Sequence, residues 1–174
     1  MRFVKMIFIG ALILFIVVTI ISLFIPSHVR ISKAINVMAP ANKVLQPVQD
    51  LHQWKLWYPL LKDIPANEVV FENADRGQTM KFKTTTVTIL KSTPSQVLAE
   101  FSAQGGKKIQ SGFNAITYSH VDSITIQWYM DFNLSWYPWE KFSSMLYEKM
   151  YGVTMERGLT NLKAIVEESR SSMK

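Results

Sequence analysis

Three histidines are the side chains of this sequence best suited to proton transfer near neutral pH. His28 follows a long apolar segment, His52 lies two residues after Asp50, and His120 lies among turn-forming residues. None of the three stands at a diagnostic spacing from a second catalytic residue. A Ser-His-Asp grouping stays open, because residues distant in sequence can assemble such a triad in space.

The sequence carries no pattern typical of a metal or phosphate site. It contains no cysteine and lacks the His-x-x-x-His and Glu-x-x-His spacings that bind transition metals. Gly105-Gly106 lacks the Gly-Lys-Ser/Thr ending of a phosphate-binding loop, so it predicts a hairpin turn. We therefore expect no metal and no cofactor.

Asp131 is the one carboxylate set inside a strongly alternating segment, Ser123–Leu134. Alternation of this kind predicts a strand with one buried face. The apolar face consists of Ile126, Trp128, Met130, Phe132 and Leu134. Asp131 falls on the opposite face, where we expect it to be exposed to solvent. An inward-facing Asp131 would instead be a candidate general acid or base.

The elements that must position these residues are mostly strands. Between Val29 and Val37 the apolar residues fall on alternate positions, interrupted only by Lys33. Further strand-like stretches are separated by turn residues, which predicts an antiparallel meander. They are Val69–Glu72, Thr79–Lys83, Thr85–Lys91, Gln96–Ala103, Gln110–Tyr118 and Ser123–Leu134.

Two short helices are expected between the first strand and the meander. Pro40 suits the first turn of one helix, and Pro47 is expected to end or kink it. Asp50 is expected to cap the second helix, Leu51–Trp57. Trp54 and Trp57 share a face of this helix, where packing in the core is favoured over a ligand mouth.

A long helix is expected at the C-terminal end, from Glu140 to Glu168, with a possible bend around Gly152. This segment lacks proline, and its apolar residues recur mostly every third or fourth position. They are Phe142, Leu146, Met150, Val153, Leu159, Leu162 and Val166. In the preceding turn, Trp136 and Trp139 fit either a membrane interface or packing.

An uncharged apolar run, Met6–Ile25, lies near the N-terminus. A helix of this length spans roughly 30 Å, the hydrocarbon thickness of a bilayer. The run is longer than the apolar part of a secretory signal and ends without an Ala-x-Ala-like cleavage site, which favours an uncleaved anchor. We expect an anchor at 1–26, one domain at 27–168 and a polar tail at 169–174.

The basic residues indicate little about the orientation of the apolar segment in a membrane, and they do not indicate nucleic-acid binding. Arg2 and Lys5 precede the apolar run and Arg30 and Lys33 follow it, so the charge bias across the run is small. The lysines and arginines behind the net charge of +6 are scattered, which favours a solvated surface over a nucleic-acid site. We expect a single-pass protein of the bacterial inner membrane with its domain on the periplasmic side.

The order of elements is similar to that of a known superfamily. The segments Ile35–Pro40 and Asp50–Pro59 resemble the opening of the START/Bet v1-like (SRPBCC) superfamily, in its polyketide cyclase/dehydrase-like bacterial branch. Met155–Lys163 resembles the closing helix of that branch, and the resemblance extends from Val29 to Glu168. It implies an α+β helix-grip fold, in which an antiparallel sheet curls around the long C-terminal helix.

A sheet curled around a helix predicts an interior between them, either a ligand cavity or a filled core. The residues expected to line a cavity are Ile126, Trp128, Met130, Phe132, Met155 and Leu159. We expect a hydrophobic small molecule, lipid-like or polycyclic, to bind there without chemistry. A cyclase/dehydrase-type enzyme, which the resemblance implies, and an interaction domain with a filled core are the alternatives.

Overall fold

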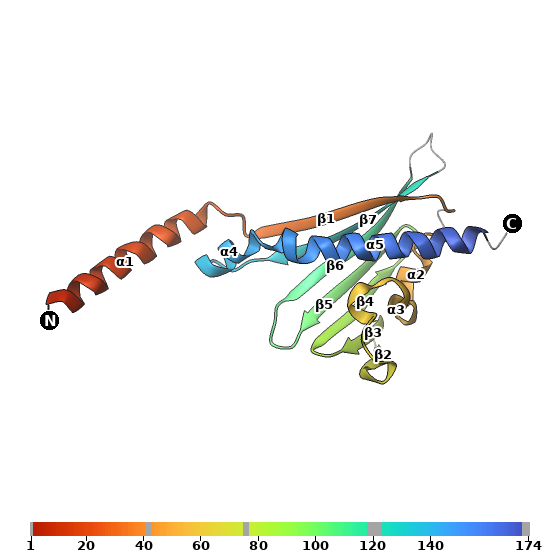
Figure 1. Ribbon diagram of the computed structural model, residues 1–174, viewed down its shortest axis with the longest axis horizontal. Helices are drawn as coiled ribbons and strands as arrows, with labels where there is room; N and C mark the ends of the chain where they lie inside the picture. The colour runs from red at the N-terminus through yellow and green to blue at the C-terminus, as the bar shows by residue number, and fades with distance from the viewer. Residues whose placement is uncertain (1, 41–42, 75–76, 118–122, 172–174) are drawn as a thin grey trace.

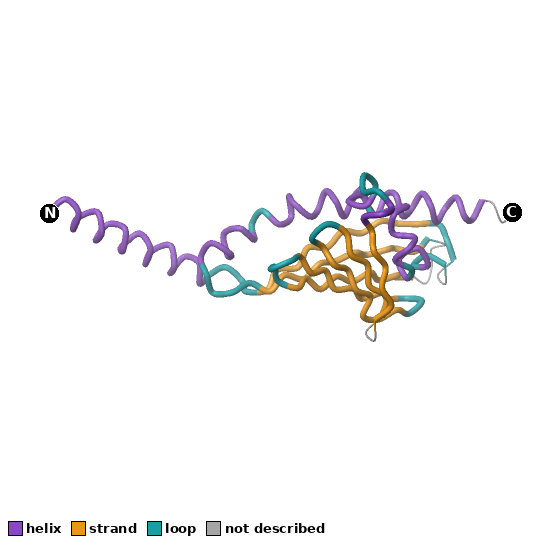
Figure 2. The backbone as a smooth tube through the Cα atoms, turned by 90° about the horizontal axis from the view of Figure 1, so that it is seen from below, coloured by secondary structure: helices purple, strands orange, loops and turns teal. Residues whose placement is uncertain are grey.

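A seven-stranded antiparallel sheet forms the body of the molecule, and the helices lie along one side of it (Figures 1 and 2). The computed structural model describes residues 2–40, 43–74, 77–117 and 123–171. The strands run in the spatial order β1-β7-β6-β5-β4-β3-β2. They are β1 (His28–Val37), β2 (Val69–Ala74), β3 (Gly77–Phe82), β4 (Thr85–Ser92), β5 (Gln96–Ala103), β6 (Lys108–Thr117) and β7 (Ile124–Asn133).

Strand β7 lies between β1 and β6 and contributes several buried side chains to the interior. Met130 pairs with Ile31 of β1 on one side and with Ser111 of β6 on the other. Successive side chains of a strand point to opposite faces, so Trp128, Met130 and Phe132 all face the helices. The apolar face predicted from the sequence is confirmed as the inner face of the sheet.

The long helix α5 (Tyr147–Ser171) lies against this inner face and runs along β1 (Figure 1). Its buried residues include Met155, Leu159, Leu162 and Val166. The expected α+β helix-grip arrangement is therefore confirmed.

The prediction that the long helix starts at Glu140 is wrong. A separate helix, α4 (Pro138–Ser144), precedes α5, and the chain turns at Met145 and Leu146 rather than bending at Gly152. Leu146, Met150 and Val153 are exposed although their spacing predicts a buried face. Periodicity identifies an apolar stripe on a helix, but it does not identify what covers that stripe.

The segment between β1 and β2 forms short helical turns beside the sheet. Among them are α2 (Gln46–Gln49) and α3 (Trp54–Trp57), with 3₁₀ turns at 51–53, 59–61 and 66–68. Pro47 does not end the first helix; it lies in the first turn, where its missing N–H is not needed. Asp50 caps the next turn as expected, because its carboxylate accepts a hydrogen bond of 3.0 Å from the His52 N–H.

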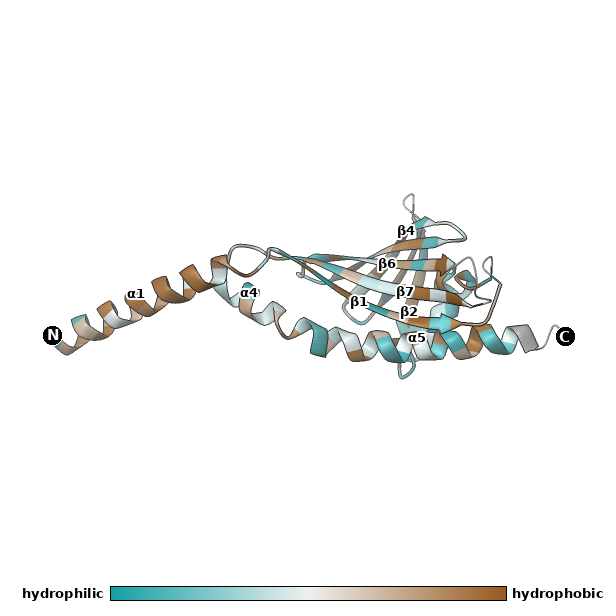
Figure 3. Ribbon diagram, turned by 90° about the horizontal axis from the view of Figure 1, so that it is seen from above, coloured by the Kyte–Doolittle hydropathy of each residue, from teal (hydrophilic) through white to brown (hydrophobic). Residues whose placement is uncertain are grey.

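The N-terminal helix α1 (Arg2–Leu23) extends away from the sheet and is apolar along most of its length (Figure 3). Ser22 is its one buried residue. Within the described part of the chain, it is the one helix long and apolar enough to cross a membrane, a property that anchors and signal sequences share.

Lys33, which interrupts the alternation of β1, has a partner on α5. Its Nζ lies 2.6 Å from Glu148 Oε1 and 2.8 Å from Glu156 Oε1. Hydrogen bonds to these carboxylates raise the pKa of Lys33 to about 12. Gly152 lies between the two glutamates and leaves room for the lysine, since a Cβ there would approach Lys33 Cε to 3.1 Å. The charge therefore ties the edge strand to the helix.

Candidate ligand-binding cavity

A cavity of about 310 Å³ lies between α5 and the inner face of the sheet. This volume is at the lower end of the range that small-molecule sites occupy, roughly 300 to 1,000 Å³. Most of its walls are apolar, and none of the lining side chains carries a charge at neutral pH. They are Tyr58, Leu60, Thr85, Phe101, Ala103, Ile109, Trp128, Met130, Met150, Tyr151, Thr154 and Met155.

Strand alternation and helical periodicity bring these side chains together. Trp128 and Met130 are two residues apart on β7, so both point inward. Tyr151 and Met155 are four residues apart on α5 and therefore share one face of that helix. Because α5 follows the edge strand β1, space remains beside it over β5 and β6, which supply Phe101 and Ile109.

Aromatic packing fills the interior on the other side of Trp128. The Trp57 and Trp128 rings lie edge to face at 5.8 Å, and Phe113 stacks on Trp128 at 4.9 Å. The indole N–H of Trp54 donates to the carbonyl oxygen of Val48 at 2.9 Å, and both Trp54 and Trp57 are fully buried. These two tryptophans belong to the packed core. The space between the sheet and the helices is therefore partly filled by side chains and partly open as the cavity.

The structure places the six predicted lining residues in three different surroundings. Trp128, Met130 and Met155 border the cavity. Ile126 and Leu159 lie in the packed core and do not line it. Phe132 lies beyond the other end, where it packs on the rings of two α5 tyrosines.

Phe132 lines a second hollow of about 480 Å³, which shares Ala103, Ile109 and Tyr151 with the cavity. This hollow reaches towards α4. A polar bridge lies at its far end, where Lys107 Nζ contacts Glu140 Oε2 at 2.5 Å. The Lys107 ammonium, with help from the backbone N–H of Ser135, lowers the pKa of Glu140 below its ordinary value.

Tyr58 contributes a hydroxyl to the cavity wall. The residue is 5% exposed, and its hydroxyl has no hydrogen-bond partner among the residues that the structure describes. Burial raises its pKa well above the ordinary tyrosine value, with a further rise from nearby Tyr151. Burial also raises the pKa of Tyr151. Both groups are therefore neutral hydroxyls at physiological pH.

Residues 28–167 match the protein family described as polyketide cyclase / dehydrase and lipid transport. The chain belongs to this family. The match takes in all seven strands and nearly the whole of α5, so the resemblance read from the opening and closing segments is confirmed.

Solved structures share the fold of this polyketide cyclase/dehydrase family member at low sequence identity. CalU16 from Micromonospora echinospora is 14% identical, with a TM-score of 0.55, over 79% of this chain and 73% of its own. A START superfamily protein from Mycobacterium smegmatis is 17% identical, with a TM-score of 0.54, over 80% and 97%. The di-domain ARO/CYC StfQ of the steffimycin biosynthetic pathway is 10% identical, with a TM-score of 0.63, over 83% and 52%. No curated protein is significantly similar in sequence.

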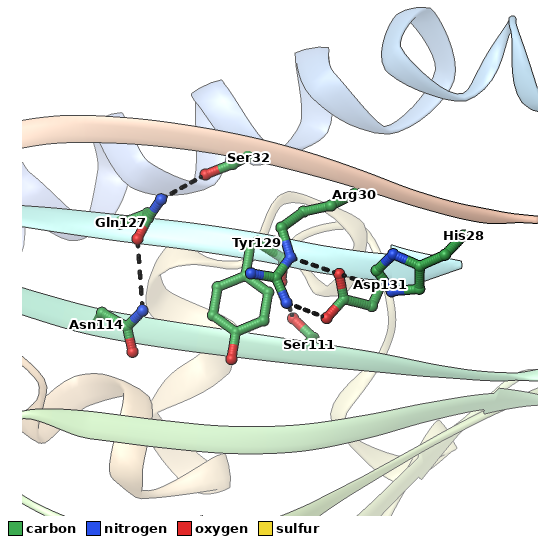
Figure 4. Close-up of polar contacts among 8 residues, drawn as sticks. All are labelled: His28, Arg30, Ser32, Ser111, Asn114, Gln127, Tyr129 and Asp131. Carbon is green, nitrogen blue, oxygen red and sulfur yellow. Dashed lines mark hydrogen bonds and ion pairs between the residues drawn. The ribbon is translucent and has the colours of Figure 1, made fainter. Parts of the chain in front are cut away.

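A two-pronged ionic contact in this family member lies outside the cavity, on the outer face of the sheet (Figure 4). Arg30 donates two hydrogen bonds of 2.6 Å to the carboxylate of Asp131 and lies over the Tyr129 ring, 4.4 Å from its centroid. The expectation that Asp131 is exposed is wrong, because it is 8% exposed beneath these neighbours. Strand parity nevertheless places it on the face opposite the cavity, so it does not reach a ligand there.

The residues of a possible Ser-His-Asp triad do not converge within the described part of the chain. His28 Nε2 lies 3.6 Å from Asp131 on the outer face. Ser111 Oγ accepts from the Trp128 indole at 2.8 Å and donates to the Tyr129 carbonyl oxygen. His52 stacks on Phe71, and His120 lies outside the described residues. Among the described side chains, no group of three or more His, Cys, Asp or Glu could hold a metal ion.

The residues predicted from the sequence include only one of the four aromatic residues that line the cavity and none of its hydroxyl groups. Phe101 belongs to a correctly predicted strand, and its alternation with buried neighbours could have identified it. Tyr58 and Tyr151 carry no such signal. Tyr58 follows a short helix, and Tyr151 depends on the rotation of α5 about its own axis.

Proposed function

We propose that this protein is a membrane-anchored binder of a neutral hydrophobic small molecule, which it holds between α5 and β5–β7. The observation that carries the proposal is the 310 Å³ cavity whose lining residues are apolar or hydroxyl-bearing. The family description, which includes lipid transport, agrees with a hydrophobic ligand.

The cavity wall favours an uncharged ligand. A carboxylate or ammonium moved into an apolar site without a partner loses its hydration, which is far more costly than burying a neutral group. The walls offer hydroxyls and no charge to replace that hydration. The Tyr58 hydroxyl is positioned to hydrogen-bond a single ligand oxygen, while the rest of the ligand contacts Phe101, Met130 and Met155.

The anchoring part of the proposal rests on α1. Its 22 residues span roughly 33 Å at 1.5 Å per residue, enough to cross the hydrocarbon core. All of them except Ser22 are left outside the packed interior. We propose that the helix remains attached, with its N-terminus in the cytoplasm and the ligand-binding domain on the periplasmic side.

Binding without chemistry is favoured over a cyclase-type reaction by the groups in the cavity. A general base works best with a pKa near the operating pH. The two titratable lining groups are Tyr58 and Tyr151, and burial moves the pKa of each further above neutrality. The carboxylate of Asp131 is on the other face of the sheet and is paired with Arg30.

Lipid analysis of the purified full chain tests this function. Wild type and Met130→Trp are extracted from membranes, exchanged into phosphatidylcholine nanodiscs and analysed by organic extraction and mass spectrometry. We expect a neutral apolar compound to accompany the wild type and to be depleted in Met130→Trp. Leu56→Trp is the matched control, because it adds the same ring at an exposed position that does not line the cavity. Identical extracts from all three proteins would contradict the proposal.

A further inference from the structure

A cluster of aromatic and aliphatic side chains is exposed where β7 leads into α4. Trp136 and Trp139 are each 61% exposed. Each of their rings contacts the ring of Tyr137, with a centroid distance of 4.8 Å in both pairs. We call this surface the aromatic ledge, and it consists of Trp136, Tyr137, Trp139, Phe142, Met145 and Leu146. Contiguous exposed apolar surface of this kind marks an interaction site.

The ledge is fixed in place next to the end of α1. Lys141 of α4 is 4% exposed, and its Nζ donates to the Ile25 carbonyl oxygen at 2.8 Å and to Ser27 Oγ at 2.7 Å. These two acceptors lie just after α1 ends. Helices α1 and α4 also contact each other, and they lie side by side in Figures 1 and 3. The ledge therefore lies at the level where α1 stops.

We propose that the aromatic ledge inserts into the interfacial layer of the bilayer that α1 crosses. Tryptophan and tyrosine concentrate at this depth, because their rings are apolar while their N–H and O–H groups remain hydrated. Helix α4 presents the exposed rings outward, while the charged end of Lys141 is buried and donates two hydrogen bonds. A lipid surface, rather than a protein, is the occupant because the ledge continues the apolar surface of α1. This inference rests on the proposed anchoring.

Docking of the ledge would set the orientation of the cavity. The second hollow, which shares Tyr151 with the cavity as a lining residue, is lined near α4 by Leu134, Glu140 and Tyr147. Glu140 belongs to the same helix as the ledge residues Trp139 and Phe142. A ligand that leaves the bilayer beside the ledge would therefore enter the cavity by way of this hollow. The distance that it crosses in water would be short.

Tryptophan quenching by brominated lipid tests the ledge on the full chain. The five tryptophans divide into buried Trp54, Trp57 and Trp128 and the two exposed ledge residues. In vesicles of phosphatidylcholine brominated at carbons near the headgroup, we expect strong quenching in the wild type. The double variant Trp136→Phe, Trp139→Phe is expected to lose most of it, with an unchanged melting temperature.

Flotation of the same vesicles separates failure of the ledge from failure of the anchor. Protein that floats but shows the same weak quenching in wild type and double variant would overturn the ledge and leave the anchor intact. Protein that does not float would overturn the anchoring and the ledge together. Protein that floats with quenching specific to the ledge residues supports the inference.

Discussion

Individual side chains decide how the inner and outer faces of the sheet differ. On the outer face, Asp131 is neutralised by Arg30, and the Tyr129 ring lies over Gly112, where a Cβ would approach the ring to 2.2 Å. On the cavity side, the hydroxyl of Tyr58, which follows α3, has no hydrogen-bond partner among the described residues. The charges of Arg30 and Asp131 therefore lie on the face of the sheet opposite the cavity.

Replacement of Tyr58 by Phe is expected to weaken ligand binding while the fold is kept. The substitution removes one hydroxyl and leaves the ring, which packs against Trp54 and Trp128. A single hydrogen bond contributes about 0.5 to 1.5 kcal/mol, so affinity for a ligand with an oxygen should fall about twofold to tenfold. The measurement is a competition titration in nanodiscs. Equal affinities would show that the hydroxyl does not contact the ligand.

At the scale of elements, the strands were predictable and the junctions between helices were not. Gln96–Ala103 was predicted at its observed bounds, because alternation and flanking turns are local signals. The division into α4 and α5 was missed, since Leu146 and Met150 continue an apolar pattern that the core does not cover. The cavity lining was only partly predictable, because it depends on the position of α5 over the sheet and on residues from four separate strands.

Two glycines on α5 are expected to respond differently to alanine. At Gly158 a Cβ would lie 2.9 Å from Trp128 Cζ3 and 3.4 Å from Pro59 Cδ, inside the packed core. Gly158→Ala should therefore lower the stability by about 1 to 3 kcal/mol, the usual effect of overpacking. Gly152→Ala meets the flexible end of Lys33, so the gain of about 1 kcal/mol in helix propensity offsets most of that contact. Thermal or urea unfolding of both variants checks this order, which equal losses would refute.

The bridge between Lys107 and Glu140 predicts a pH dependence for the attachment of α4. Because the folded pKa of Glu140 is depressed, its contribution to stability is complete above the unfolded pKa of about 4.5. That contribution is lost as the pH falls through the lower, folded pKa. The stability difference between wild type and Glu140→Gln should thus shrink on acidification below about pH 4.5. Unfolding curves at several pH values measure it, and a constant difference would argue against the bridge.

The whole molecule consists of the apolar helix α1, a domain that contains the cavity, and the aromatic ledge between them. The order of strands and helices could be predicted from sequence because each element has its own periodicity. The position of the ledge could not, since Lys141 and Ile25 are far apart in sequence and meet only in the fold.

A chain that begins at Ser27 is expected to fold cooperatively, since α1 contributes only Ser22 to the buried residues. It loses the Ile25 acceptor of Lys141 and leaves the ledge uncovered, so we also expect concentration-dependent association. Circular dichroism during heating and sedimentation measure the two effects. Melting without a transition would show that the anchor and the domain are not separable.

Photocrosslinking with a neutral lipid analogue tests whether the cavity holds a hydrophobic molecule. The full chain in phosphatidylcholine nanodiscs is irradiated with a diazirine-bearing diacylglycerol, and the modified peptides are mapped by mass spectrometry. We expect adducts on the peptides that contain Phe101, Met130 and Met155, and their loss in Met130→Trp but not in Leu56→Trp. Adducts confined to α1 and the ledge, and equal in all three proteins, would contradict it.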